Sequence, residues 1–398
     1  MKVFFLMLSY SDVKNTTNLY TDIVKEFVVN GHDVVVAAPT RDGRKTGLYC
    51  EGGVNVLRIK TMPLFGVNSI LKGIANISLP YIFKRIIKKY IKQSFDLIIM
   101  PTPPITFCTL ANTLKKEWKA KTYLILRDIF PQNAVDLGLL RNSLLISYFR
   151  KKEKYIYSIS DQIGCMSQGN IDYVKTHNPE INVKKLHLLP NWMTYNEESI
   201  KVDDMNKEKY GFNGKFVAIF GGNIGLPQKL EFVIEVANKL RNNNDIVFLI
   251  VGYGSEKNRL FKMINDLKLS NVKLFDFLPK EEYNKLLAIS NVGLITLHDK
   301  FTIPNIPSKT VTYMAMGKPI LAAIDKATDY NQIIGNANCG LCSLMGDIDG
   351  FVENITKIKN NVKMLNEMGN AGKIYYQNYL RTSTAYQTII SKLDEAIS

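Results

Sequence analysis

The alternation of short apolar runs with amphipathic segments is the feature that most constrains the fold of this chain. Segments such as 229–240 and 281–288 carry apolar residues at helical spacing between those runs. Strand and helix patterns in strict alternation indicate parallel sheets covered by helices. The first series of strands is predicted at Val3–Leu8, Asp33–Ala38, Val54–Ile59, Leu97–Met100, Thr122–Leu126, Gln162–Met166 and Leu186–Leu189. The second is predicted at Phe216–Phe220, Val247–Val251, Val272–Phe275, Val292–Thr296, Ile320–Ala323 and Gly340–Ser343.

Two such series predict two domains. The chain has 398 residues, and a single core rarely grows past about 250–300 residues. The expected fold class is α/β, with two Rossmann-like domains whose parallel sheets face a central cleft. We predict a first domain at 1–190, a linker at 191–213, where the sequence turns polar, and a second domain at 214–375. A final helix over 376–398 is expected to rejoin the first domain.

The charge balance points to an acidic partner. The net charge is +15, and no acidic residue lies between Glu51 and Asp96. A helix over 83–92 would carry an apolar face of Phe83, Ile86, Ile87, Tyr90 and Ile91, and a basic face of Lys84, Arg85, Lys88, Lys89 and Lys92. Two interpretations stay open: the helix lies on an anionic membrane, or it packs its apolar face on its own domain. Nucleic acid is not expected, because no recognition motif is present.

The expected location is the cytoplasm. No apolar stretch is long enough to span a bilayer, and the start of the chain has the pattern of a buried strand rather than of a signal peptide. Five scattered cysteines argue against a disulfide framework. The Cys339–Cys342 pair has no second ligand pair at zinc-finger spacing, so packing around a late strand is the favoured interpretation and no metal is expected.

Three segments of the second half follow strands and could contact a ligand. Phe220–Lys229 is glycine-rich, Val251–Glu256 contains Gly252 and Gly254, and Ile303–Lys309 ends in Pro-Ser-Lys. Glycines let a backbone approach a ligand, and helix starts favour anions. We predict that Ser255 and Ser308 cap the helices that follow and that Lys309 supports an anion site. Simple turns remain the alternative at each position.

In the first half, Arg127 and Asp128 directly follow a predicted strand. Side chains at the carboxyl end of a parallel strand are expected to face the ligand-binding crevice. The alternative is a salt bridge between loops.

These segments together resemble one branch of glycosyltransferase family 4, which has the GT-B fold. The similarity to bacterial L-fucosamine transferases of O-antigen and capsule synthesis lies in Arg127–Gln132, Leu189–Trp192, Gly222–Gly225 with Gln228, Ile250–Gly254, Pro307–Lys309 and Gly317–Pro319. The resemblance implies a retaining transferase without metal or other cofactor. It implies a nucleotide-sugar donor, UDP-linked by expectation, held by the second domain. It also implies an acceptor held by the first. The Asp347–Asp349 pair is accordingly interpreted as a helix cap.

The resemblance carries over to individual residues. It implies catalytic roles for Lys309, Asp128 and Arg127: Lys309 would stabilise the leaving diphosphate, Asp128 would orient the acceptor, and Arg127 would neutralise an acceptor phosphate or hold Asp128. The donor-binding set it implies is Gly222, Asn223, Gly225, Gln228, Lys229, Gly252, Gly254, Pro307, Ser308, Lys309 and Thr312.

The chain also departs from the family pattern. Pro304 and Thr312 stand where many members have two glutamates. Leu226 and Gln228 stand where an Arg and a Lys usually meet the diphosphate, with Lys229 displaced by one position. Arg127 replaces a common histidine. In this sequence the ribose would therefore have to be held without the glutamate that many members use.

The expected function is transfer of a sugar, by expectation an N-acetylated amino or deoxyamino sugar, to a polyprenyl-diphosphate-linked sugar in surface polysaccharide (capsule or O-antigen) synthesis. The enzyme is expected on the inner face of the bacterial plasma membrane. The basic helix face would serve the acceptor and the membrane. Two alternatives remain: a non-catalytic nucleotide-sugar-binding partner subunit, suggested by the missing glutamates, and a GT-B sugar-nucleotide 2-epimerase. The oligomeric state is not predicted.

Overall fold

The structure is a computed structural model that describes residues 1–11, 17–40, 43–63, 69–196 and 205–395. The chain divides into two compact units. The first comprises Met1–Thr194 and Thr382–Ser398, and the second comprises Tyr195–Arg381. Residues 197–204 of the predicted linker and residues 396–398 lie outside the described residues. The roles we assign to the units, acceptor binding and donor binding, stay predictions.

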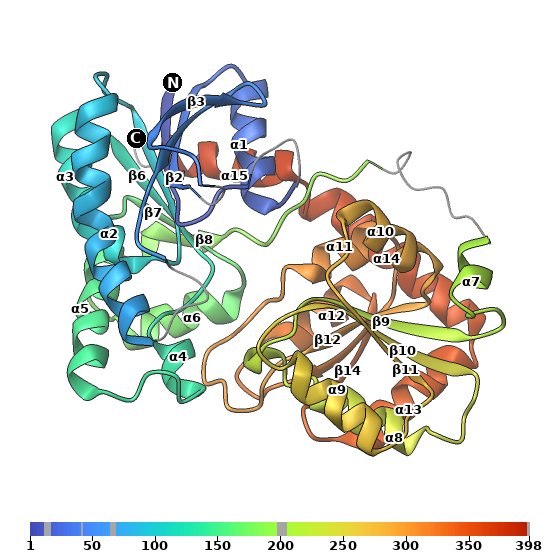
Figure 1. Cartoon of the computed structure of the whole chain (residues 1–398). Coiled ribbons are helices and arrows are strands. Elements are labelled where there is room, and N and C mark those ends of the chain that lie inside the picture. Colours follow the sequence, from blue (N-terminus) through green and yellow to red (C-terminus); the bar gives the residue numbers. More distant parts are fainter. Residues whose placement is uncertain (12–16, 41–42, 64–68, 197–204, 396–398) are drawn as a thin grey trace. The chain divides into compact units, whose positions relative to one another are not determined.

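The first unit is built on an eight-stranded sheet within the described residues (Figure 1). The order across the sheet is β3-β4-β2-β1-β5-β6-β7-β8, and all neighbours are parallel except β3 and β4. The strands are β1 (Lys2–Leu6), β2 (Asp33–Pro39), β3 (Gly47–Glu51), β4 (Val54–Ile59), β5 (Leu97–Pro101), β6 (Lys121–Leu126), β7 (Gln162–Cys165) and β8 (Leu186–Leu188).

Helices cover both faces of this sheet. They are α1 (Leu19–Val29), α2 (Ser69–Tyr90), α3 (Cys108–Trp118), α4 (Gln132–Asp136), α5 (Ser143–Ile159), α6 (Gln168–His177) and α15 (Thr382–Glu395), with 3-10 turns at Ile105–Phe107 and Val183–Lys185. Helices α2, α3, α5 and α6 share one core cluster with one face of the sheet. Helices α1 and α15 share another with the opposite face.

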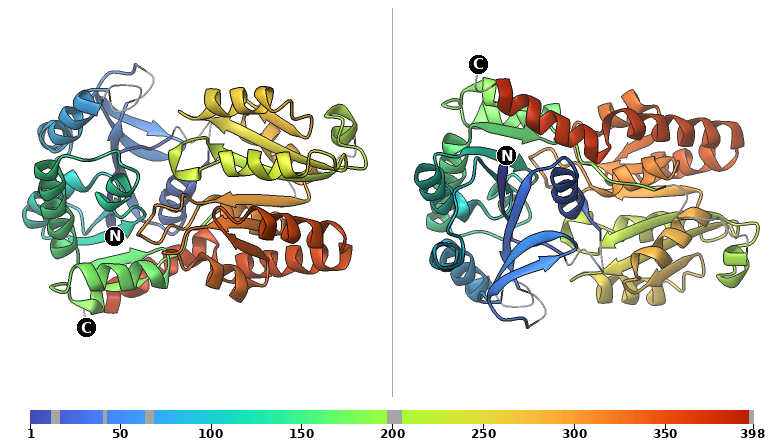
Figure 2. Two further views of the ribbon diagram at one scale, coloured as in Figure 1. Left: turned by 90° about the horizontal axis from the view of Figure 1, so that it is seen from below. Right: turned by 90° about the horizontal axis from the view of Figure 1, so that it is seen from above.

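Helix α15 comes from the far end of the sequence but packs beside α1, as Figure 2 shows. Tyr386 of α15 lies edge-on to Phe27 of α1, with ring centroids 4.9 Å apart. Its hydroxyl is also 2.7 Å from His32 Nε2. The predicted helix over 376–398 is therefore two helices, because α14 (Val362–Tyr379) belongs to the second unit and the chain re-enters the first unit at Thr382.

Helix α2 decides between the two interpretations of the amphipathic 83–92 segment. Phe83 and Ile87 are fully buried in the core of the first unit, and Ile86, Tyr90 and Ile91 pack against that core. The apolar face is therefore not available for insertion into a bilayer. The five basic side chains of the opposite face, Lys84, Arg85, Lys88, Lys89 and Lys92, are exposed.

The second unit contains a fully parallel six-stranded sheet among the described residues, in the order β11-β10-β9-β12-β13-β14. Its strands are β9 (Phe216–Asn223), β10 (Ile246–Tyr253), β11 (Val272–Phe275), β12 (Val292–Thr296), β13 (Ile320–Ile324) and β14 (Gly340–Leu344). Its helices are α7 (Met205–Lys209), α8 (Glu231–Lys239), α9 (Lys257–Asp266), α10 (Lys280–Ile289), α11 (Lys309–Ala315), α12 (Tyr330–Ala337), α13 (Ile348–Lys359) and α14, with a 3-10 turn at Leu226–Gln228. No helix among the described residues is both long and apolar enough to cross a membrane.

The order of this second sheet places a topological switch between β9 and β12, where the strand order reverses. In open parallel sheets, ligands bind beyond the carboxyl ends of the strands at such a point. The ends of β9, β10 and β12, and the start of α11, are therefore where a site is expected in this unit.

Candidate functional site

Two glycine-rich segments meet at the carboxyl edge of the second sheet. Strands β9 and β10 stay in register to their ends, so that Gly222 pairs with Gly252. Gly252 has φ of 153°, and a Cβ atom there would overlap the Gly222 carbonyl oxygen. Gly254 lies equally close to Ile224, whose N–H donates to the Tyr253 carbonyl at 2.7 Å. The structure thus brings together Gly222, Gly252 and Gly254, three of the residues whose donor-binding role stays a prediction.

Lys309 lies at the same edge. Helix α11 is held against β9 by Tyr313, whose hydroxyl donates to the Ile219 carbonyl at 3.2 Å. Lys309 Nζ lies over the Phe220 ring, 3.4 Å from its centroid, and close to Gly222. Burial lowers the pKa of Lys309 from 10.5 to about 7. In the described part of the chain, this ammonium group has no carboxylate partner, so an anion placed beside Gly222 would supply its missing counter-charge.

The loop after β9 has a different structure from the predicted helix start. Residues 226–228 form a 3-10 turn that ends at Lys229, in the left-handed region with φ of 44°, and α8 begins only at Glu231. Gln228 accepts a hydrogen bond from the Gly225 N–H at 3.2 Å and another from the Asn223 side chain at 3.4 Å. Gln228 and Asn223 therefore shape this loop, and no long helix starts here toward an anion.

Lys229 already has a partner within the second unit. Its ammonium group lies 2.7 Å from Asp299 Oδ1, and the same carboxylate lies 3.0 Å from His298 Nδ1. The His298 N–H also donates to the Pro227 carbonyl at 3.0 Å, which joins the loop after β9 to the loop after β12. A phosphate bound by Lys229 would compete with Asp299, a residue that spacing alone did not indicate.

The predictions for the Pro-Ser-Lys segment are only partly met. Ser308 stands at the N-cap position of α11, but its hydroxyl makes no cap hydrogen bond. The first free N–H groups turn back on the chain, from Thr310 to the Pro307 carbonyl and from Val311 to the Ser308 carbonyl, both at 3.2 Å. Ser255 does not cap α9 either, since the N-cap is Glu256. Both capping predictions are wrong. Ser308 has helical backbone angles (φ −63°, ψ −25°) instead of the extended ones that an N-cap needs, and Ser255 lies one position before the N-cap residue. Thr312 lies on α11 and is partly buried.

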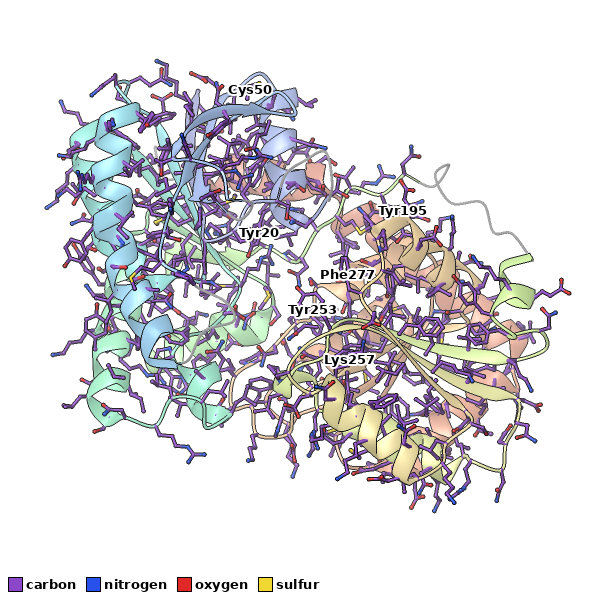
Figure 3. The ribbon with its side chains drawn as sticks, in the orientation of Figure 1. Tyr20, Cys50, Tyr195, Tyr253, Lys257 and Phe277 are labelled. Carbon is purple, nitrogen blue, oxygen red and sulfur yellow. The ribbon has the colours of Figure 1, made fainter. Side chains whose placement is uncertain are left out.

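An exposed aromatic pair stands next to these loops (Figure 3). Tyr253 ends β10 and Phe277 follows β11, with ring centroids 5.8 Å apart and planes at 74°. Both side chains are more than half exposed. Beside them Lys257, at the start of α9, forms an ion pair with Asp276. Aromatic rings exposed at a ligand-binding edge offer flat surfaces on which a planar group can stack.

In the first unit, the end of β6 carries Arg127 and Asp128. Their two backbone N–H groups both donate to the Thr102 hydroxyl, at 2.9 and 3.1 Å, which fixes the chain as it leaves the strand. Arg127 Nη1 donates to Asn191 Oδ1 at 2.8 Å, and the guanidinium group stacks on Trp192 at 4.3 Å from the ring centroid. Two of the sequence motifs, Arg-Asp and Pro-Asn-Trp, therefore form one cluster.

The structure differs from the expectation that the Arg127 side chain faces a ligand-binding crevice. The side chain is buried, because the segment carrying Asn191 and Trp192 closes over it. Burial lowers the pKa of Arg127 to about 10. Burial also raises the pKa of Asp128 from 3.8 to about 6, against the opposing effect of Arg127. Asp128 is only partly buried and so remains the group of this cluster that a ligand could reach.

The remaining sequence features have structural roles. Lys318 of the Gly-Lys-Pro motif donates to the carbonyls of Ala288 and Ser290 at 2.6 and 2.7 Å, where α10 ends. Asp347 caps α13 by accepting from the Gly350 N–H at 2.9 Å, as predicted. Cys339 and Cys342 are free thiols at β14. Among the described residues, no group of three or more His, Cys, Asp or Glu lies close enough to bind a metal ion.

Comparison with known proteins finds a family match within the second unit. Residues 202–375 match the family model for glycosyl transferases group 1. The probable glycosyltransferase WbjE of Pseudomonas aeruginosa is 27% identical over 281 residues, which cover 68% of this chain and 67% of that protein. WcaI of Escherichia coli (strain K12), a candidate colanic acid biosynthesis glycosyl transferase, is 25% identical over 249 residues, 59% of each chain.

Solved structures show the same fold over the whole chain. Sucrose-phosphate synthase from Thermosynechococcus elongatus has a TM-score of 0.79 at 13% identity and covers 100% of this chain and 99% of its own. Anabaena HepE in complex with UDP-glucose has a TM-score of 0.71 at 15% identity, with 99% and 100% covered. At such identities the likeness concerns the fold alone. The chain has the GT-B fold, and its residues 202–375 match the model of the glycosyl transferases group 1 family.

Proposed function

We propose that this protein is a retaining glycosyltransferase that moves a sugar from a nucleoside diphosphate donor to an acceptor hydroxyl. The observation that carries the proposal is the environment of Lys309: a partly buried ammonium beside the exposed Gly222 backbone, without a carboxylate partner among the described residues. A buried cation without a counter-charge favours an anionic ligand. The two phosphates of a sugar nucleotide supply such a charge.

The chemistry that this arrangement supports is cleavage of the bond between the sugar C1 and the β-phosphate oxygen. The bonding electrons leave with that oxygen, whose new negative charge Lys309 stabilises. The acceptor hydroxyl oxygen bonds to C1 on the same face, and its proton passes to the departing phosphate oxygen. Retention follows without a side-chain nucleophile and without a metal ion or cofactor in the reaction.

Asp128 is the residue we propose to orient the acceptor. Its backbone N–H donates to the Thr102 hydroxyl at 3.1 Å, which fixes the chain at this residue, and its side chain is only partly buried. Of the two roles for Arg127, neutralising an acceptor phosphate has more support than holding Asp128, because the guanidinium group donates its hydrogen bond to Asn191.

We propose UDP as the nucleotide of the donor. The support is the fold likeness to Anabaena HepE, which has been crystallised with UDP and with UDP-glucose. The donor would lie along Gly222, Asn223, Gly225, Gln228, Lys229, Gly252 and Gly254, and against Pro307, Ser308, Lys309 and Thr312. Thr312 would take the place of the glutamate that holds the ribose in many relatives.

The acceptor we propose is a sugar linked to polyprenyl diphosphate, in surface polysaccharide synthesis at the inner face of the plasma membrane. WcaI, named for colanic acid biosynthesis, supports the polysaccharide context. The exposed basic face of α2 supports contact with anionic lipid. Reversing the charges of Lys84, Lys88 and Lys92 is expected to reduce binding to anionic vesicles, and unchanged binding would remove α2 from the proposal.

The first experiment is a thermal-shift screen of the full chain over nucleotides and nucleotide sugars, followed by transfer assays with the best donor. A ligand that binds the folded state raises the melting temperature, and the increase grows with the logarithm of the ratio of ligand concentration to Kd. Lys309→Ala is expected to lower kcat on the order of 10²–10³-fold. The matched control is Lys273→Ala, which removes an exposed lysine of the same unit.

The assay also separates the alternatives. An epimerase would convert UDP-N-acetylglucosamine without any acceptor. A non-catalytic partner subunit would bind the nucleotide and transfer nothing to any acceptor. A kcat that stays at the wild-type value in Lys309→Ala would refute the proposed role of this residue.

A further inference from the structure

Three leucines at the junction of α4 and α5 are exposed to an extent that is unusual for this residue type. Leu139 is 65% exposed, Leu144 79% and Leu145 43%. They fall within seven consecutive residues of the first unit. Leucine side chains are among those most often buried in folded proteins, and apolar groups that gather on a surface mark a contact with another apolar phase. We call Leu139, Leu144 and Leu145 the leucine tip.

The leucine tip is a built part of the structure. The Leu139 N–H donates to the Ala134 carbonyl at 2.8 Å. Arg141 Nε donates to the Gly138 carbonyl at 3.0 Å, which closes the loop. Asn142 caps α5 by accepting from the Leu145 N–H at 3.0 Å. The backbone is hydrogen-bonded on both sides of the tip, so the three side chains are displayed by a fixed scaffold.

The surroundings of the tip are cationic. No acidic residue lies between Asp136 and Glu153. Arg141 and Lys151 are exposed, and Lys152 Nζ lies 5.5 Å from the centroid of the Tyr148 ring. Leu144, Tyr148 and Lys151 follow one another at i, i+4 and i+7 and so share a face of α5. Arg150 does not contribute, because Glu153 neutralises it at 2.8 Å.

We propose that the leucine tip inserts into the interfacial region of an anionic lipid bilayer, with Arg141, Lys151 and Lys152 on the lipid headgroups. This inference rests on the proposed function, whose acceptor is lipid-linked. An apolar tip flanked by cations and an aromatic ring matches the layered polarity of a membrane interface. A protein partner would need an apolar pocket with acidic residues around it that fits this tip. An anionic bilayer offers an apolar interior and a negatively charged surface everywhere.

Helix α2 offers an anionic membrane a basic face but no apolar one. The basic face of that helix can attract anionic lipid, but its apolar face is buried in the core of the first unit. Charge alone gives weak, salt-sensitive attachment, and stable attachment needs a second, apolar contribution. The leucine tip supplies it from the same layer, since α2 and α5 both pack against the 3-10 turn Ile105–Phe107.

The test is co-sedimentation of the full chain with vesicles of phosphatidylcholine, with and without phosphatidylglycerol. The variant is Leu139→Ser/Leu144→Ser/Leu145→Ser, expected to bind anionic vesicles roughly tenfold or more weakly than wild type. The matched control is Val29→Ser/Val362→Ser/Ile374→Ser, which removes three other exposed apolar side chains and is expected to bind like wild type. Both variants alter exposed positions, and their melting temperatures check that the fold is kept.

Wild-type binding that survives high salt, together with loss of binding in the leucine variant alone, would support insertion. Equal binding of the leucine variant and wild type would overturn the proposal, as would binding abolished by salt in wild type. The UDP-dependent thermal shift of the same samples is read in parallel. If it is absent in wild type, the proposed function fails independently of the membrane result. If the UDP-dependent shift is present in wild type, the leucine variant and the control variant, the vesicle result concerns the leucine tip alone.

Discussion

Replacing Lys309 by methionine is expected to stabilise the second unit while weakening its binding of a nucleoside diphosphate. Methionine keeps the length and the apolar stem of the side chain and removes the charge. In the free protein this charge is held close to the Phe220 ring, and burial lowers the pKa of Lys309 from 10.5 to about 7. The ammonium group lowers the stability of the free protein and strengthens binding of the diphosphate, so its loss is expected to raise the stability and weaken the binding.

The size of the stabilisation follows from that pKa. A fall from 10.5 to about 7 corresponds to an upper bound of about 5 kcal/mol of lost stability near neutral pH. Residual exposure of Lys309 and its attraction to the Phe220 ring offset a large part of this cost. We therefore expect Lys309→Met to raise the free energy of unfolding by about 2 kcal/mol. For a unit of this size, that raises the melting temperature by about 4–8 °C. The loss of a charge-assisted contact to phosphate is expected to weaken UDP binding about 10–100-fold.

The pH dependence gives a second check. Between the folded-state pKa of about 7 and the unfolded value, the unfolded chain binds more protons. The stability of wild type therefore rises with pH across this window. Lys309→Met lacks this dependence, so the difference in unfolding free energy between the variant and wild type is largest below pH 7 and shrinks toward pH 10. Scanning calorimetry at several pH values measures this difference, and titration calorimetry measures the affinity of each protein for UDP. A variant that melts lower than wild type at pH 6, or binds UDP as well, would refute the reasoning.

Three further predictions concern separate parts of the molecule. Wild-type activity is expected to fall below pH 6, because Asp128, with its pKa raised to about 6, becomes protonated there. Asp128→Asn is expected to have a lower kcat at pH 7.5 and no such fall at acid pH. A pH–rate profile tests this, and a variant whose activity still falls below pH 6 as in wild type would contradict it. Tyr253→Ala is expected to weaken UDP binding about 5–50-fold by removing a stacking surface, with pyrophosphate binding as the comparison that should not change. Lys318→Met is expected to destabilise the fold by about 1–3 kcal/mol, because two carbonyls at the end of α10 lose their donor, with UDP affinity measured at low temperature remaining at the wild-type value.

Much of the fold could be predicted from the sequence, because strands buried on both faces leave continuous apolar runs. Each of the thirteen predicted strands appears in the structure. Strand β3 was missed: it is an antiparallel edge strand with alternating exposure, and its sequence Gly-Leu-Tyr-Cys-Glu has no apolar run. The helix after β9 begins late because Lys229 adopts a left-handed conformation, which residue preferences do not indicate for lysine.

The candidate site was less predictable, because its properties arise from segments distant in sequence. The glycines after β9 and β10 could be identified from the sequence as candidate site residues, because close approach of two backbones requires glycine at those positions. Nothing near Lys309 in the sequence indicates that Phe220 will lie beneath its ammonium group. Nothing near Arg127 indicates that Trp192 will cover it. Such contacts depend on which strands become neighbours, and composition and spacing do not fix that.

The placement of α15 has a consequence for synthesis on the ribosome. Ile389 and Leu393 complete the same core cluster as Ile23 and Phe27, so the first unit lacks part of its interior until these late residues emerge. The second unit, by contrast, is contiguous from Tyr195 to Arg381 and can finish folding earlier. The first unit can therefore complete its core only after the second unit has been synthesised, and we expect it to stay incompletely packed during that interval.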